Sequence, residues 1–225
     1  MRKKFTLLIL LASFSTAFSN NPIVLKELDQ EIVFDGVPDE AAWEPVENLP
    51  LTMHMPTFGK EPTEESIIKL AYDKEYLYLS GSLLISQPDL ILAKSKKRDA
   101  MVGSTDWFGI LIDSYNDREN ALAFFTNPNG LRLDVNVFND AIGALPINTS
   151  WNTFWDVKTQ IRSDGWFVEM RIPFSSLQFQ STGDEIMMGI TTWRWIAKKM
   201  KWMSIRLFPP IGVTGVPGNL PIPSG

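Results

Sequence analysis

The sequence contains no cysteine, and its 225 residues include a single histidine, His54. Without cysteine the protein can form no disulfide bond, offers no thiol nucleophile and has no thiol to carry a lipid anchor. A zinc site is not expected either, because zinc in proteins is bound mainly by cysteine and histidine. The chain also lacks the G-x-S-x-G motif. These absences argue against a nucleophilic or zinc-dependent enzyme.

Positive charge is also scarce. Lysine and arginine number 21 against 26 acidic residues, which gives a formal net charge of −5. Nucleic-acid binding needs basic residues to neutralise phosphates, so an acidic chain argues against that partner. A glycosidase would need two carboxylates about 5–10 Å apart, and the sequence indicates no cleft to hold such a pair. We therefore expect a non-catalytic protein.

Residues 1–19 have the layout of a secretory signal peptide. Basic residues at 2–4 precede an apolar run over 5–18, and Ala17 and Ser19 are the small residues at −3 and −1 of a cut after residue 19. The run is too short for a comfortable transmembrane helix. We expect export to the periplasm or cell surface, with outer-membrane association as a further option.

Most of the remaining chain alternates between apolar and polar residues, as half-buried antiparallel strands do. In 130–138, leucine and valine alternate with Arg132, Asp134 and Asn136. Glycine, proline, asparagine and aspartate punctuate these segments. The pattern predicts an all-β, two-sheet jelly-roll sandwich over 20–207, with a few short helices. The predicted strands include 66–73, 76–85, 106–113, 130–138, 166–172 and 186–195.

The segments at the two ends of this domain lack the regular alternation of its strands. Residues 208–225 are rich in proline and glycine and show no period, so they predict an unpaired tail or a truncated linker. The opening stretch VFDGVPDEAAW, residues 33–43, predicts an Asp-Gly turn, a one-turn helix capped by Asp39, and a lid formed by Trp43.

The sequence has eight tryptophans, and aromatic residues are usually buried in the core. Three of them are predicted on strand faces opposite the apolar residues. Tryptophan beside planar polar groups is typical of a sugar-binding surface, because sugars offer C–H faces to rings and hydroxyls to bidentate groups. A solvated face with cross-strand ion pairs is the alternative. The predicted carbohydrate-binding residues are Trp107, Trp193, Trp195, Arg98, Arg132, Asp134 and Asn136.

Aspartates are numerous in the central segment. Loop carboxylates are the hard oxygen ligands that Ca²⁺ prefers, although no EF-hand spacing is present. The sequence therefore suggests a structural calcium ion, with Asp106, Asp113 and Asp117 as its predicted ligands.

Six sequence motifs, taken in their order along the chain, resemble the carbohydrate-binding family 9-like domain. The similarity is greatest to the version at the N-terminus of large secreted proteins of Bacteroidetes-type bacteria, where a DUF5916 region thought to form an outer-membrane β-barrel follows. The resemblance covers roughly residues 23–207 and implies a jelly-roll sandwich, polysaccharide binding linked to carbohydrate catabolism, and a core role for Trp43. The motifs span 33–43, 71–79, 97–100, 106–134, 151–157 and 165–179.

Two hypotheses follow from the residues and the resemblance. In the first, the chain is an exported module that binds a polysaccharide or oligosaccharide without cleaving it. In the second, it is a periplasmic structural or interaction domain of an outer-membrane β-barrel protein, with the sugar site lost. The feature that separates them is whether Trp107, Trp193 and Trp195 are exposed together beside polar groups.

Overall fold

A computed structural model describes residues 23–100, 103–142, 146–179, 185–205 and 210–214. The predicted signal peptide and most of the predicted tail lie outside these residues. Within the part of the chain that is described, no helix is long and apolar enough to span a membrane.

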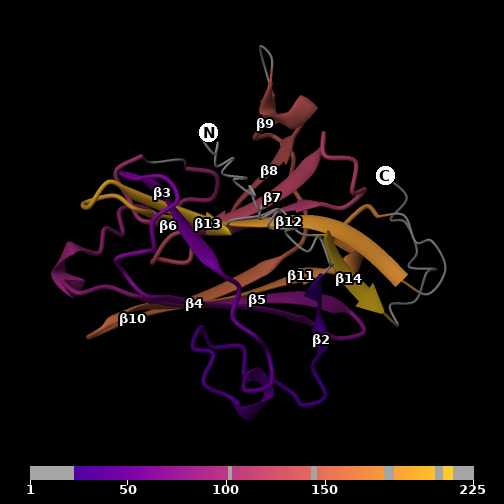
Figure 1. The fold of residues 1–225 in the computed structure, drawn as a ribbon, viewed down its shortest axis with the longest axis horizontal. Helices are drawn as coiled ribbons and strands as arrows, with labels where there is room; N and C mark the ends of the chain where they lie inside the picture. Colours follow the sequence, from indigo (N-terminus) through magenta and orange to yellow (C-terminus); the bar gives the residue numbers. More distant parts are fainter. Residues whose placement is uncertain (1–22, 101–102, 143–145, 180–184, 206–209, 215–225) are drawn as a thin grey trace, which may run out of the picture.

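The described chain folds into two β-sheets that pack face to face (Figure 1). This confirms the predicted all-β sandwich. The five-stranded sheet has the order β10-β11-β5-β4-β2 and is antiparallel except for the pair of β2 and β4. Its strands are β2 (Lys26–Glu27), β4 (Ser66–Tyr72), β5 (Tyr76–Leu84), β10 (Asp156–Arg162) and β11 (Gly165–Pro173).

The nine-stranded sheet has the order β1-β14-β12-β6-β7-β8-β9, and β13 joins β12 to β3 beside this path. Among the described strands of this sheet, only β1 and β14 pair in parallel. The strands are β1 (Ile23–Val24), β3 (Leu51–Met55), β6 (Trp107–Asp113), β7 (Ala121–Thr126), β8 (Leu133–Val137), β9 (Ile147–Asn148), β12 (Glu185–Ile196), β13 (Lys201–Ile205) and β14 (Pro210–Thr214).

Helical structure in the described residues consists of single 3₁₀ turns, which agrees with the few short helices expected. They are η1 (Ala41–Trp43), η2 (Pro88–Leu90), η3 (Asn139–Ala141) and η4 (Phe174–Ser176).

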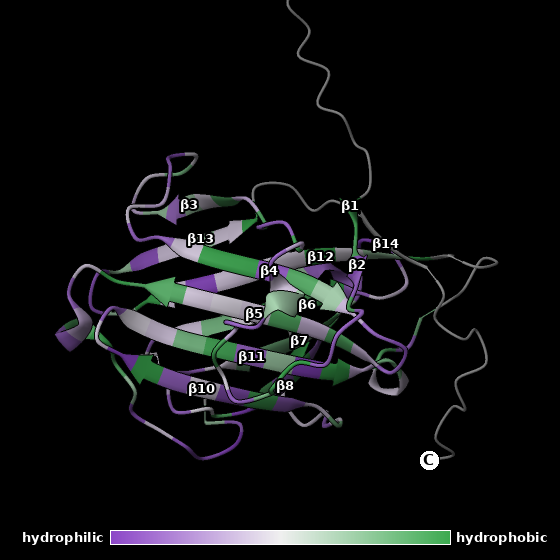
Figure 2. Ribbon diagram, turned by 90° about the horizontal axis from the view of Figure 1, so that it is seen from below, coloured by the Kyte–Doolittle hydropathy of each residue, from purple (hydrophilic) through white to green (hydrophobic). Residues whose placement is uncertain are grey.

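The core lies between the sheets and is built from alternate residues of the facing strands. Leu79 of β5, Val168 of β11 and Phe108 of β6 are completely buried there. Figure 2 shows the alternation of hydrophobic and hydrophilic residues along the strands. Because side chains alternate across a strand, this core also fixes which residues point away from it on the outer faces.

The opening segment lies across the outer face of the five-stranded sheet (Figure 1). Trp43 is 2% exposed and packs there with Ala71 and Tyr78, so it fills a satellite cluster and not the space between the sheets. The expected cap is wrong, because Glu40 precedes η1 and makes no side-chain cap bond. The predicted glycine turn is confirmed. Gly36 has φ +101°, and a Cβ there would lie 2.7 Å from the Thr159 backbone nitrogen.

The expectation of an unpaired tail is wrong for five residues. Pro210–Thr214 form β14, which pairs with β12 in antiparallel fashion and with β1 in parallel. Proline and glycine in this segment hid a strand that sequence periodicity alone does not reveal.

Candidate functional site

Tryptophans gather on the outer face of the nine-stranded sheet. Strand register places Trp195 of β12 between Trp107 of β6 and Trp202 of β13. Even-numbered residues of β12, such as Ile186 and Ile190, belong to the core, so the odd-numbered tryptophans point outward. The predicted Trp107, Trp193 and Trp195 therefore lie on one face.

A stack of rings runs across this face. Trp193 and Trp202 stack with centroids 4.4 Å apart, and His54 of β3 stacks on Trp202 at 4.5 Å. Phe125 meets Trp193 edge-on at 6.2 Å, and Phe58 meets His54 edge-on at 5.1 Å. We call the whole group the aromatic surface; its members are His54, Phe58, Trp107, Phe125, Trp193, Trp195 and Trp202.

A glycine makes room for part of the aromatic surface. Gly109 of β6 lies opposite both Phe125 and Trp193 in register. A Cβ at Gly109 would lie 2.3 Å from the Phe125 ring. The missing side chain lets that ring lie over β6 and reach Trp193 from two strands away.

The rings differ in what they offer to a ligand. Trp107 is only 8% exposed, and Trp193, Trp195 and Trp202 are half-buried, whereas Phe58 is 77% exposed. Both faces of Trp202 are covered by Trp193 and His54, so Trp202 can present only its edge. Open ring area for stacking is therefore greatest at Phe58.

His54 belongs to the stack as a neutral ring. Its Nε2 is hydrogen-bonded to the Ser204 hydroxyl at 2.7 Å. Burial lowers the pKa of His54 below its usual value of 6.5. An uncharged imidazole stacks on an indole without the cost of burying a charge.

Arg194 fixes the strand that carries Trp193 and Trp195. It lies on the core side of β12, is 2% exposed, and donates to the carbonyl oxygens of Glu65 at 2.6 Å and Leu84 at 2.5 Å. Burial lowers its pKa to about 10, so it stays charged at neutral pH. These bonds tie β12 to the opposite sheet and hold the outward tryptophans in place.

The predicted polar residues do not join the tryptophans, and Trp107 is buried. The three predicted tryptophans are therefore not exposed together beside the predicted polar groups. Asp134 and Asn136 lie opposite Phe124 and Leu122 in register, on the inward side of β8. The predicted sidedness of 130–138 is therefore wrong, because Leu133 and Val135 of β8 face outward and pack beneath Trp107.

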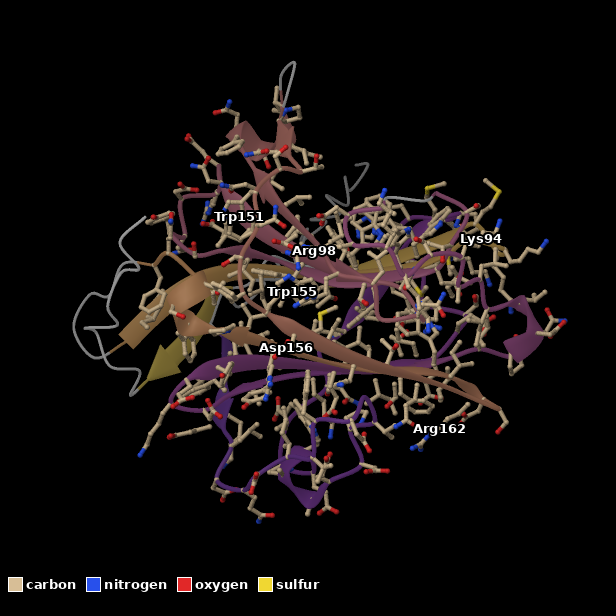
Figure 3. The ribbon with its side chains drawn as sticks, turned by 180° about the vertical axis from the view of Figure 1, so that it is seen from behind. Lys94, Arg98, Trp151, Trp155, Asp156 and Arg162 are labelled. Carbon is tan, nitrogen blue, oxygen red and sulfur yellow. The ribbon has the colours of Figure 1, made fainter. Side chains whose placement is uncertain are left out.

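Asp134 is a buried acceptor that anchors segment 149–155 at the side of the sandwich. It is 0% exposed and accepts hydrogen bonds from Arg98 Nη2 at 2.5 Å, the Thr153 amide at 2.8 Å and Trp155 Nε1 at 3.2 Å. Arg132 Nη1 donates to the Trp155 carbonyl at 2.8 Å. Figure 3 shows Arg98, Trp151 and Trp155 gathered where segment 149–155 passes between the sheets. Asp134, Arg98 and Arg132 thus anchor this segment, away from the aromatic surface.

The three predicted calcium ligands do not converge. Asp106 precedes β6, is 2% exposed and accepts the Ala197 amide at 2.9 Å, while Asp113 ends the same strand. Burial raises the pKa of Asp106 to about 6. Both oxygens of Asp113 accept amides of the following turn, at 3.1 and 2.7 Å. The described residues hold no group of three or more histidine or acidic side chains suited to a metal ion.

Comparisons with known proteins support the fold. No family model and no curated protein matches the sequence. Two structures of a family 9 carbohydrate-binding module from Caldicellulosiruptor kristjanssonii are similar at 20% identity. The complex with cellotriose has a TM-score of 0.58 and covers 91% of this chain and 100% of the module. The complex with glucose has a TM-score of 0.60 and covers 89% and 100%.

A third structure comes from a Bacteroides uniformis protein proposed to bind carbohydrate. It is 12% identical, has a TM-score of 0.64, and covers 85% of this chain and 98% of that protein. Likeness at such low identity describes the backbone and not the ligand. The described chain has the fold of a family 9 carbohydrate-binding module.

Proposed function

We propose that this chain is a non-catalytic carbohydrate-binding module that binds a polysaccharide or oligosaccharide on its aromatic surface. The observation that carries the proposal is the gathering of aromatic rings on one outer sheet face of a family 9 fold. The two similar structures show the module from Caldicellulosiruptor kristjanssonii in complex with cellotriose and with glucose.

Ring contacts are the main source of affinity in this proposal. Hydroxyl hydrogen bonds contribute only about 1 kcal/mol each, because water competes for the same groups. His54 and Ser204, which lie on this face, already bond to each other. We therefore expect weak, reversible binding with a Kd in the micromolar to millimolar range, roughly −8 to −4 kcal/mol.

The biological setting belongs to the same proposal. The basic and apolar start of the chain favours export to the periplasm or cell surface. An exported glycan-binding module would serve carbohydrate catabolism by holding polysaccharide near degrading enzymes. Mass spectrometry of the exported protein tests the first step, since an intact Met1 would contradict cleavage.

Affinity electrophoresis through gels containing a panel of soluble polysaccharides tests the binding. The wild type should be retarded by at least one neutral glucan, and Phe58→Ala and Trp193→Ala should lose the retardation. Phe154→Ala is the matched control, because Phe154 is 85% exposed but lies on segment 149–155 and not on the aromatic surface. Absence of retardation on every glycan would overturn the proposal.

One observation favours a different function. Trp193 and Trp202 cover each other, and Met55, which is 41% exposed, lies next to Trp202 in register. An apolar border of this kind also suits a protein partner. The second candidate is thus an interaction domain for an outer-membrane β-barrel region. It would be preferred if the wild type bound no glycan but bound a purified DUF5916 barrel region, and if Phe58→Ala and Trp193→Ala disrupted that binding.

A further inference from the structure

A small cavity lies at the end of the sandwich where the β6–β7 turn meets the end of β8. Its volume is about 150 Å³. Leu122 of β7 is also among its lining residues. The side chains that the argument uses are Ser114, Tyr115, Asn120, Asn136, Phe138 and Gln178.

The side chains that line the cavity are uncharged. Among the described residues that form it there is no acidic or basic side chain. Three carboxamides, from Asn120, Asn136 and Gln178, are combined with the rings of Tyr115 and Phe138. A charged ligand would lose its hydration without gaining an ion pair, so this lining suits an uncharged polar molecule.

The carboxamides retain unused hydrogen-bonding capacity. Asn120 donates its Nδ2 to Asp117 at 2.8 Å, which leaves its Oδ1 as an acceptor. Gln178 accepts the Tyr115 hydroxyl at 3.4 Å through Oε1, which leaves its Nε2 as a donor. The half-buried Asn136 side chain makes no hydrogen bond to the described protein atoms, so both its donor and its acceptor are free.

The turn beside the cavity is held rigidly. Asp113 accepts the amides of Asp117 and Arg118, at 3.1 and 2.7 Å. Asp117 Oδ1 in turn accepts the amides of Glu119 and Asn120, both at 2.8 Å. A site on a fixed turn loses less conformational entropy when a ligand binds. Asp113 and Asp117, two of the predicted calcium ligands, thus accept backbone amides of this turn.

We propose that this cavity is a second ligand site, which takes one uncharged, hydroxyl-rich ring such as a neutral hexose. Its volume lies well below the roughly 300–1,000 Å³ of sites for larger ligands, so it admits a single ring. The rings of Tyr115 and Phe138 would contact the apolar C–H face, and Asn136 would bond hydroxyls through both its oxygen and its nitrogen. The site shares its ligand class with the proposed function but none of its residues.

Nuclear magnetic resonance of the side-chain NH₂ groups tests the site directly. Glucose, galactose and mannose are titrated to about 50 mM, a range that covers weak binding. Saturable shifts of the Asn120, Asn136 and Gln178 signals are expected for at least one sugar. Asn136→Ala should weaken that binding at least tenfold, while Asn48→Ala, at an exposed asparagine outside the cavity, should leave it unchanged.

Tryptophan fluorescence separates this site from the aromatic surface. No tryptophan is among the described lining residues, so filling the cavity should leave the emission unchanged, whereas binding near Trp193 and Trp195 should alter it. If Asn136→Ala does not fold, the exposed Gln178→Ala replaces it, and the same loss is expected. Non-saturating shifts for all three sugars, or wild-type affinity in both variants, would overturn the inference and leave the aromatic surface unaffected.

Discussion

Trp193 and Trp202 stack face to face across β12 and β13, with centroids 4.4 Å apart and 24° between the ring planes. Since His54 covers the other face of Trp202, that ring is held like a core residue although it lies on an outer face. The aromatic surface therefore combines rings that maintain the structure with rings that are free to bind.

Replacing the two kinds of ring should separate stability from binding. We expect Trp202→Ala to lower the free energy of unfolding by about 2–3 kcal/mol, because a half-buried indole and two stacking contacts are lost. Phe58→Ala should change it by less than about 0.5 kcal/mol, since Phe58 is 77% exposed. Urea unfolding measures both, and equal stability losses would show that the exposed ring is also structural.

A pair of glycines tests how tightly the opening segment lies on the five-stranded sheet. Gly36 and Gly59 both have positive φ, +101° and +79°, so alanine is strained at either. Only at Gly36 would the new Cβ meet backbone, 2.7 Å from the Thr159 nitrogen, whereas nothing lies within 4 Å at Gly59. We expect Gly59→Ala to cost about 1 kcal/mol and Gly36→Ala to cost about 2–4 kcal/mol. Comparable urea midpoints for the two variants would contradict this close contact.

Strand periodicity predicted the sandwich but not the stack of rings. The alternation in 106–113 and 186–195 is long enough to indicate strands with outward tryptophans. The partners Trp202, His54 and Phe125 come from β13, β3 and β7, which have five or six residues each and gave no prediction. A register shift between Trp202 and Met203 also helps to place His54 against Trp202, and such a shift leaves no trace in periodicity.

The direction in which the β8 side chains point shows a second limit of prediction from strand periodicity. Apolar residues usually face the core, so the alternation in 130–138 predicts Asp134 at the surface. In the structure Asp134 turns inward because Arg98, Thr153 and Trp155 supply hydrogen-bond donors that come from other parts of the chain. Such long-range compensation depends on tertiary structure, and no local pattern predicts it.

Asp134 should consequently be sensitive to substitution even though it touches no part of the aromatic surface. Asp134→Ala leaves the buried Trp155 Nε1 and the partly exposed Arg98 guanidinium without their shared acceptor. Because the Arg98 side chain is 33% exposed and stays solvated, we expect a loss of about 2–3 kcal/mol, mainly from the donors left without their acceptor. Thermal unfolding followed by circular dichroism measures it. A loss below about 1 kcal/mol would show that segment 149–155 is held by its apolar contacts alone.

The last prediction concerns pH and the buried carboxyl of Glu169. Glu169 is 1% exposed, and its Oε2 accepts the amides of Asp35 at 3.1 Å and Gly36 at 2.9 Å. Its Oε1 and the Glu40 Oε2 are buried without a hydrogen-bond partner. Burial, reinforced by the nearby Glu40 carboxylate, raises the pKa of Glu169 to about 7, although the two amides act in the opposite direction.

A carboxyl whose pKa is higher in the folded protein than its usual 4.5 favours folding when protonated. Its stabilising effect is complete below about pH 4.5 and is lost as the pH rises towards 7, by about 1.4 kcal/mol for each pH unit in that window. Glu169→Gln keeps an oxygen for the two amides and cannot ionise. We therefore expect the stability of Glu169→Gln relative to the wild type to increase between pH 4.5 and 7 and then to level off. Urea unfolding at pH 4.5, 6 and 8 measures this difference; Asp106 and Glu64 titrate in both proteins, so their effects cancel in the comparison. A difference that stays constant across these pH values would mean that Glu169 is ionised throughout.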